Sequence, residues 1–69
     1  DSDAILDACE RMHNHQILHN NLTMKSVGFT RNDPNHCVII NFEHSFPCFT
    51  RIPDLVRAKD LMLLPFYQE

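Results

Sequence analysis

The segments MHNHQILHNNLTMKSV (residues 12–27) and CVIINFEHSF (residues 37–46) decide the fold of this chain. In the first segment, the apolar residues Ile17 and Leu18 are followed by a histidine and two asparagines, without a steady hydrophobic period. This pattern is typical of a loop that a few buried side chains hold in place. The second segment begins with the apolar and largely β-branched run Cys37–Phe42. Such a run predicts a short and mostly buried strand.

A β-hairpin is expected between these two segments. Residues 27–30 (VGFT) form a candidate first strand, and residues 31–36 (RNDPNH) carry the strongest turn signal of the chain. Asparagine, aspartate and proline favour turns because they tolerate or fix the backbone angles that turns require. The two strands are therefore predicted to pair across a loop of about six residues.

An amphipathic helix is predicted ahead of the loop, over residues 3–14. Ser2 is a suitable N-cap for it. The apolar residues of this segment recur at helical spacing and form one stripe, made of Ala4, Ile5, Ala8, Cys9 and Met12. On the more polar side, Asp7 and Arg11 are spaced to form an i,i+4 ion pair.

A second helix is predicted over residues 53–64, with Pro53 in its first turn and Pro65 beyond its end. One face of this helix carries the apolar residues Leu55, Val56, Leu61 and Met62. The run LMLLPFY (residues 61–67) is more apolar than one packed face requires. Two interpretations stay open: the helix packs on the first helix and the hairpin, or it leaves an apolar patch for a protein partner.

Length and composition predict a single α+β segment over residues 1–69, made of a helix, a loop, a β-hairpin and a helix. Because the chain begins with Asp1 rather than Met, we expect a fragment or a processed product. The net charge of −3 and the absence of a basic cluster argue against nucleic acid as a partner. No apolar run reaches the roughly 18 residues that cross a membrane. Three cysteines without the density of a disulfide scaffold favour an intracellular, cytoplasmic setting.

The loop and the strand resemble one half of the protein kinase-like fold. The segment MHNHQILHNNLTMKSV is similar to a helix end and catalytic loop, commonly Ile-hydrophobic-His-x-Asp-Leu-x-x-x-Asn. The segment CVIINFEHSF is similar to the apolar strand and metal-binding turn, commonly Asp-Phe-Gly. Some fungal-type and small-molecule kinases have Asp-Phe-Glu there. The fold is shared by protein kinases and by small-molecule kinases such as the choline and aminoglycoside families. The resemblance covers about residues 4–46 and implies part of a kinase C-terminal lobe.

In the catalytic loop, the resemblance implies a role for four positions. His19 falls on the loop histidine, and Leu22 falls on the leucine that anchors the loop. Asn21 falls on the catalytic aspartate, which accepts the proton of the substrate hydroxyl. Ser26 falls on the asparagine that binds the second magnesium ion.

In the metal-binding turn, the resemblance places Asn41 on the metal-binding aspartate. Phe42 then falls on the packing phenylalanine of the turn, and Glu43 falls on its third residue. The apolar strand before the turn also matches. The framework positions of the family are thus retained in this chain.

The positions that differ from the family are those that perform chemistry. Phosphoryl transfer needs carboxylate oxygens to hold Mg²⁺, but Asn21 and Asn41 are neutral amides, and Ser26 is short. The only glycine, Gly28, cannot form a glycine-rich phosphate loop. We therefore expect a pseudokinase-like fragment that holds no metal and no cofactor, although Mg·ATP is the cofactor of the family. It should not transfer phosphate, and its role, if any, should be that of a binding module.

The first alternative is a stand-alone α+β interaction domain without kinase ancestry. Geometry separates it from the kinase-like interpretation. A kinase-like chain should place Asn21, Ser26 and Asn41 side by side at the mouth of the hairpin. It should also place His19 near Phe42.

The second alternative is a small domain stabilised by zinc. Candidate ligands occur in two groups, His13, His15 and His19, and Cys37, His44 and Cys48. Neither spacing matches a common zinc site, and His13 is expected at a frayed helix end. Cys9 and Cys37 lie on predicted apolar faces, where thiols are usually inert.

Overall fold

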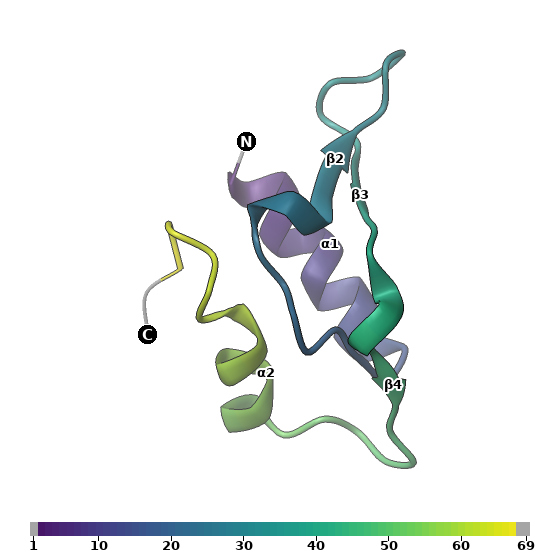
Figure 1. Cartoon of the computed structure of the whole chain (residues 1–69), viewed down its shortest axis with the longest axis vertical. Helices are drawn as coiled ribbons and strands as arrows, with labels where there is room; N and C mark the ends of the chain where they lie inside the picture. The colour runs from purple at the N-terminus through teal and green to yellow at the C-terminus, as the bar shows by residue number, and fades with distance from the viewer. Residues whose placement is uncertain (1, 68–69) are drawn as a thin grey trace.

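The computed structural model describes residues 2–67 and contains two helices and two small antiparallel sheets. The helices are α1 (Ser2–Asn14) and α2 (Asp54–Leu61). The remaining elements are the strands β1 (Ile17–Leu18), β2 (Val27–Phe29), β3 (Cys37–Ile39) and β4 (Phe46–Pro47), and the 3-10 turns η1 (Met24–Ser26) and η2 (Phe42–His44). In Figure 1, the β2–β3 hairpin runs alongside α1, and α2 lies to one side at the end of a long connection. The predicted α+β class is confirmed.

Helix α1 forms where its apolar stripe predicted it. All members of the stripe except Ala4, which is partly buried, are buried in the core. On the other side, Arg11 approaches Asp7 to 3.5 Å, as the i,i+4 spacing indicated. The helix begins at Ser2, one residue earlier than predicted, so Ser2 lies within the first turn rather than ahead of it as an N-cap.

The core lies between α1, the loop after β1, the hairpin and the segment after α2. Its buried members are Ile5, Ala8, Cys9, Met12, Leu22, Cys37 and Leu64. Leu22 is 1% exposed and therefore anchors the otherwise polar loop in the core. This agrees with the expected role of Leu22. Burial of one leucine side chain contributes roughly 1.5–3 kcal/mol, enough to hold a short loop against the core.

The hairpin pairs as predicted, with Val27 opposite Ile39 and Phe29 opposite Cys37. The expectation of a mostly buried second strand was wrong, because only Cys37 is buried and Val38 is exposed. A two-stranded sheet packs one face on α1 and leaves the other face open to water. The side chains of β3 therefore alternate in exposure, although all of them are apolar.

A second small sheet was not predicted. Strands β1 and β4 pair antiparallel, with Ile17 opposite Pro47 and Leu18 opposite Phe46. The backbone N–H of Cys48 extends the pairing with a 2.7 Å bond to the Gln16 carbonyl. Strands of two residues carry no periodic signal, so the sequence pattern could not indicate them.

Helix α2 starts at Asp54, with Pro53 as its N-cap rather than in its first turn, and ends at Leu61, before the predicted end at residue 64. Of the two interpretations left open for its apolar face, full packing does not hold, because Leu55, Val56 and Met62 are exposed. The chain beyond the helix continues in separate turns and buries Leu64 instead. The helix is rotated so that Asp60, rather than Leu55, faces the rest of the molecule.

Within residues 2–67, no helix combines the length and the apolar character needed to span a bilayer.

Candidate functional site

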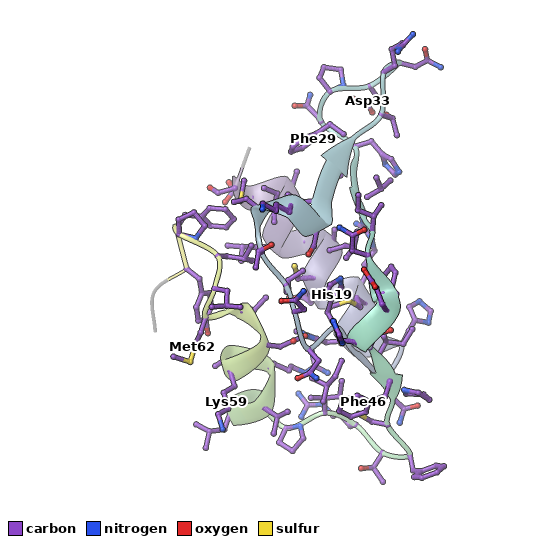
Figure 2. All side chains as sticks on the ribbon, in the orientation of Figure 1. His19, Phe29, Asp33, Phe46, Lys59 and Met62 are labelled. Carbon is purple, nitrogen blue, oxygen red and sulfur yellow. The ribbon has the colours of Figure 1, made fainter. Side chains whose placement is uncertain are left out.

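The loop between β1 and η1 is tied to the end of the hairpin through His19. This side chain is fully buried, and its Nε2 donates to the carbonyl oxygen of Ile40 at 2.7 Å. Its ring lies 5.1 Å from the ring of Phe42, tilted by 51°. Figure 2 shows His19 in the middle of the molecule, next to the turn that follows β3. The predicted proximity of His19 and Phe42 is confirmed.

The bond to Ile40 fixes the tautomer of His19. A carbonyl oxygen only accepts, so the proton must be on Nε2. The other ring nitrogen, Nδ1, is buried and has no hydrogen-bond partner within residues 2–67. His19 therefore joins the loop to the turn after β3 through one hydrogen bond and one ring contact.

The loop is also fixed from the other side by the carboxylate of Asp60 on α2. The Asp60 side chain is only 3% exposed. Its Oδ2 accepts from Nε2 of His13 at 2.7 Å and from the backbone N–H of His19 at 3.1 Å. Its Oδ1 accepts from the backbone N–H of Asn20 at 2.9 Å. One buried carboxylate thus joins α2, the end of α1 and the loop.

Two effects act on the pKa of Asp60. Burial alone would raise it, because the charged form loses its hydration. The hydrogen bond from His13 and those from the backbone N–H groups of Asn20 and His19 stabilise the carboxylate and outweigh burial. The pKa of Asp60 therefore lies below its ordinary value, and the group is ionised at neutral pH.

Asn41 occupies the sharp turn between β3 and η2. Its backbone is left-handed, with φ of 61° and ψ of 57°, a conformation that asparagine adopts more readily than most residues. Its Nδ2 donates to the carbonyl oxygen of Lys25 at 3.1 Å. The preceding Ile40 N–H donates to the carbonyl of Ser26 at 2.8 Å. The turn after β3 is thereby fastened to η1.

Ser26 closes η1 rather than pointing outward. Its buried hydroxyl donates to the carbonyl of Asn21 at 3.0 Å and accepts from the N–H of Thr23 at 3.3 Å. The Thr23 hydroxyl in turn accepts from the N–H of Lys25 at 3.2 Å, which completes a capping box. The hydroxyl of Ser26 is therefore already committed within the chain.

The structure connects three of the predicted site residues, Asn21, Ser26 and Asn41, at η1. Asn21 bonds to Ser26 through its backbone, and Asn41 bonds to the neighbouring Lys25 through its side chain. No hydrogen bond links Asn21 to Asn41 directly within the described chain. Glu43 lies in η2 and is exposed to solvent.

The zinc-ligand groups are not assembled. Among residues 2–67, no three histidine, cysteine or acidic side chains are placed to hold one metal ion. His13 and His19 are bonded to Asp60 and to Ile40 instead. The expectation that His13 lies at a frayed helix end was wrong. It is 1% exposed, because its partner Asp60 satisfies it in the core.

Cys9 and Cys37 are both buried, in agreement with their place on apolar faces. Burial raises the pKa of Cys9 to about 12, with smaller contributions from Cys37 and Asp60. Burial also raises the pKa of Cys37, and nearby Arg11 opposes this shift in part. Both thiols therefore remain protonated near neutral pH.

Asp60 is the site residue that sequence reasoning missed. It is separated from His13 by 47 residues and from His19 by 41, so no local pattern connects them. A weak local signal is present only in α1, where His13 follows Cys9 by one turn on the apolar stripe. This spacing marks His13 as a buried polar residue but does not identify its partner.

Beside the loop lies a groove of about 320 Å³. Its walls are apolar side chains from β1, the loop and the region of α2, namely Leu18, Leu22, Val56 and Leu63. Asn20, Lys59 and Asp60 complete the lining, and the oxygens of Asp60 already accept hydrogen bonds. Two of the lining residues, Val56 and Leu63, are among the exposed apolar residues of α2 and the turn after it.

Comparison with known proteins finds no family model, no curated protein and no solved structure that matches this chain.

Proposed function

We propose that this chain is a kinase-like loop-and-turn unit that does not transfer phosphate and acts as a protein-binding module. The proposal draws on the sequence resemblance described above. It is supported by the position of His19 between Ile40 and Phe42, and by the shared attachment of Asn21 and Asn41 to η1.

The observation that carries the proposal is that the oxygens of Asp60, the carboxylate bonded to the loop, already accept hydrogen bonds within the chain. Mg²⁺ prefers carboxylate oxygens, and the loop offers the amides of Asn21 and Asn41 instead. The carboxylate that does approach the loop, Asp60, is buried, and its oxygens accept three hydrogen bonds from the chain. The lone pairs that a metal ion would need on Asp60 are therefore used by hydrogen bonds within the chain.

The side chain of Asn41 supports the same conclusion. Its amide donates to the carbonyl of Lys25. An aspartate at this position could only accept, and it would face that carbonyl with a negative charge. The turn is thus suited to an amide rather than to the carboxylate that a kinase would use.

The proposed binding surface is the exposed apolar side of α2 and the turn after it. Leu55 is 81% exposed, and Met62 and Leu63 are each 62% exposed. Together with the adjacent groove, these residues offer an apolar surface that a protein partner could cover. We also propose an intracellular location, because all three cysteines are free thiols.

The test compares the melting temperature of the chain with and without Mg·ATP. We expect no change for the unmodified chain. In the variant Asn21→Asp/Asn41→Asp, we expect Mg²⁺ to raise the melting temperature, because the two new carboxylates supply the oxygen ligands that the proposed kinase-like site lacks. Binding at ten times the dissociation constant corresponds to about 1.4 kcal/mol, or about 5–10 °C for a chain of this size.

The matched control is Asn14→Asp/Asn35→Asp, which adds the same charge at the end of α1 and at the hairpin tip. This variant should not respond to Mg²⁺. A rise in the melting temperature of the unmodified chain with Mg·ATP would refute the loss of nucleotide binding. Equal behaviour of the two double variants would instead favour an interaction domain without kinase ancestry.

A further inference from the structure

The free edge of β3 lies along an open groove of about 440 Å³ between α1 and the hairpin. The groove is lined by Arg11 and Met12 of α1, by His15 just after it, and by all three residues of β3, namely Cys37, Val38 and Ile39. Side chains of successive strand residues point to opposite faces of a sheet. A groove that touches all three must therefore lie at the edge of the strand. Because β2 pairs with the opposite edge, this is the free one.

The ladder shows which backbone groups point into this groove. Ile40 N–H bonds to the Ser26 carbonyl, and Thr30 N–H bonds to the His36 carbonyl. In an antiparallel ladder, hydrogen-bonded pairs alternate with non-bonded pairs. Cys37 and Ile39 are thus non-bonded positions, and their N–H and C=O groups point away from β2. Among residues 2–67, these groups of Cys37 and Ile39 have no backbone hydrogen-bond partner, so the edge offers donors and acceptors beside apolar side chains.

The basic residues of the groove indicate that the partner carries a negative charge. Arg11 and His15 line it, and no carboxylate is among the described residues that do. The side chain of Arg11 is 58% exposed, and its contact with exposed Asp7 is 3.5 Å long. Exposed pairs of this kind contribute little, so the guanidinium is available to a second carboxylate.

We propose that the β3 edge and this groove bind an extended segment of another protein, which adds to the sheet as a strand. One face of the segment carries apolar side chains at alternate positions and one carboxylate, which meets Arg11. Strand addition of this kind obtains affinity from main-chain bonds and specificity from alternate side chains. Three strand residues span about 10 Å, so four or five residues of the partner suffice. The proposal is independent of the α2 surface and of the kinase resemblance.

The test uses the peptide acetyl-Glu-Thr-Val-Thr-Val-amide as the probe and the ¹⁵N-labelled 69-residue chain. Titration should shift the amide signals of Cys37 and Ile39 and slow the hydrogen exchange of those two N–H groups. Two N-methylated forms of the probe, modified at odd or at even positions, provide the internal control. Only one edge of the peptide faces β3, so one form should bind and the other should not.

The matched protein variants are Arg11→Glu and Arg51→Glu. Both residues are exposed arginines with a long contact to an aspartate, at 3.5 Å and 3.3 Å. Only Arg11 lines the groove. We expect Arg11→Glu to weaken probe binding about fivefold or more and Arg51→Glu to leave it unchanged.

Three results would overturn the proposal. The probe could leave Cys37 and Ile39 unshifted, or both N-methylated forms could bind equally, which would indicate apolar contact without strand addition. The signals of Cys37 and Ile39 could also shift with protein concentration alone. That result would identify a second copy of this chain as the occupant.

Discussion

Replacing Asp60 with asparagine should destabilise the chain strongly, although the shape of the side chain is kept. The carboxylate accepts from His13 Nε2 and from the N–H groups of His19 and Asn20. An amide has one accepting oxygen, so at least one of these donors loses its partner, and the others lose the charge. Hydrogen bonds to a charged group contribute about 1.5–3 kcal/mol, against about 0.5–1.5 kcal/mol for neutral ones. Relief of the buried charge offsets part of the loss.

We therefore expect Asp60→Asn to lower the free energy of unfolding by about 2–4 kcal/mol. A domain of 69 residues has a total of roughly 3–10 kcal/mol, so the loss is a large share of it. Urea unfolding followed by circular dichroism measures the change. With a slope of about 1 kcal/mol per molar urea, the midpoint should fall by about 2–4 M.

The pH dependence gives a second readout of the same group. An unfolded aspartate titrates near 3.9, and the pKa of folded Asp60 lies below its ordinary value. The stability that Asp60 contributes is therefore complete above about pH 5 and is lost as the pH falls below about 4 through the folded pKa. The asparagine variant has no group to titrate here. The difference in stability between the two proteins should shrink in acid.

The matched control is Asp54→Asn on the same helix, where the side chain is exposed and meets Arg51 at 3.3 Å. This change should cost less than about 1 kcal/mol. If Asp60→Asn cost no more than Asp54→Asn, or if its effect did not depend on pH, Asp60 would not anchor the loop as described.

Three further predictions concern single positions. Asn41→Asp should lower the free energy of unfolding by about 1–3 kcal/mol, because the new carboxylate cannot donate to the Lys25 carbonyl. Urea unfolding that shows no loss would mean that this bond does not hold the turn. Leu64→Ala, at a buried position, should cost about 2–5 kcal/mol, whereas Leu63→Ala at the neighbouring exposed position should cost little. Equal urea midpoints for the two variants would contradict the burial of Leu64 and the exposure of Leu63. Cys9 should react with a thiol reagent only as fast as the chain unfolds, because burial raises the pKa of Cys9 to about 12. Rapid labelling in the folded chain would contradict its burial.

Local patterns in the sequence predicted the elements whose contacts are close along the chain. The stripe of α1 has a clear helical period, and the hairpin has a strong turn between two apolar runs. The burial of Leu22 and the contact of His19 with Phe42 followed from the resemblance to kinase loops. The site was therefore partly predictable, because its residues come from one loop and one turn that the hairpin joins.

The sequence did not predict how α2 is oriented. Its apolar residues were compatible with a buried face that includes Leu55, but Asp60 points inward to its hydrogen bond with His13, and Leu55 is left in solvent. A buried carboxylate with three donors fixes a helix more firmly than a few apolar side chains at its surface. Such a pair depends on residues far apart in the chain, so periodicity cannot indicate it.

The proposed function rests on the claim that neutral amides occupy the positions where a kinase would hold its metal ion. Manganese broadens the NMR signals of nearby nuclei, so it reports directly on cation binding at this loop. When Mn²⁺ and ATP are added to the ¹⁵N-labelled chain, the amide signals of Asn21, Ser26 and Asn41 should broaden no more than those of the exposed hairpin tip. Selective loss of these three signals at low Mn²⁺ would contradict the claim.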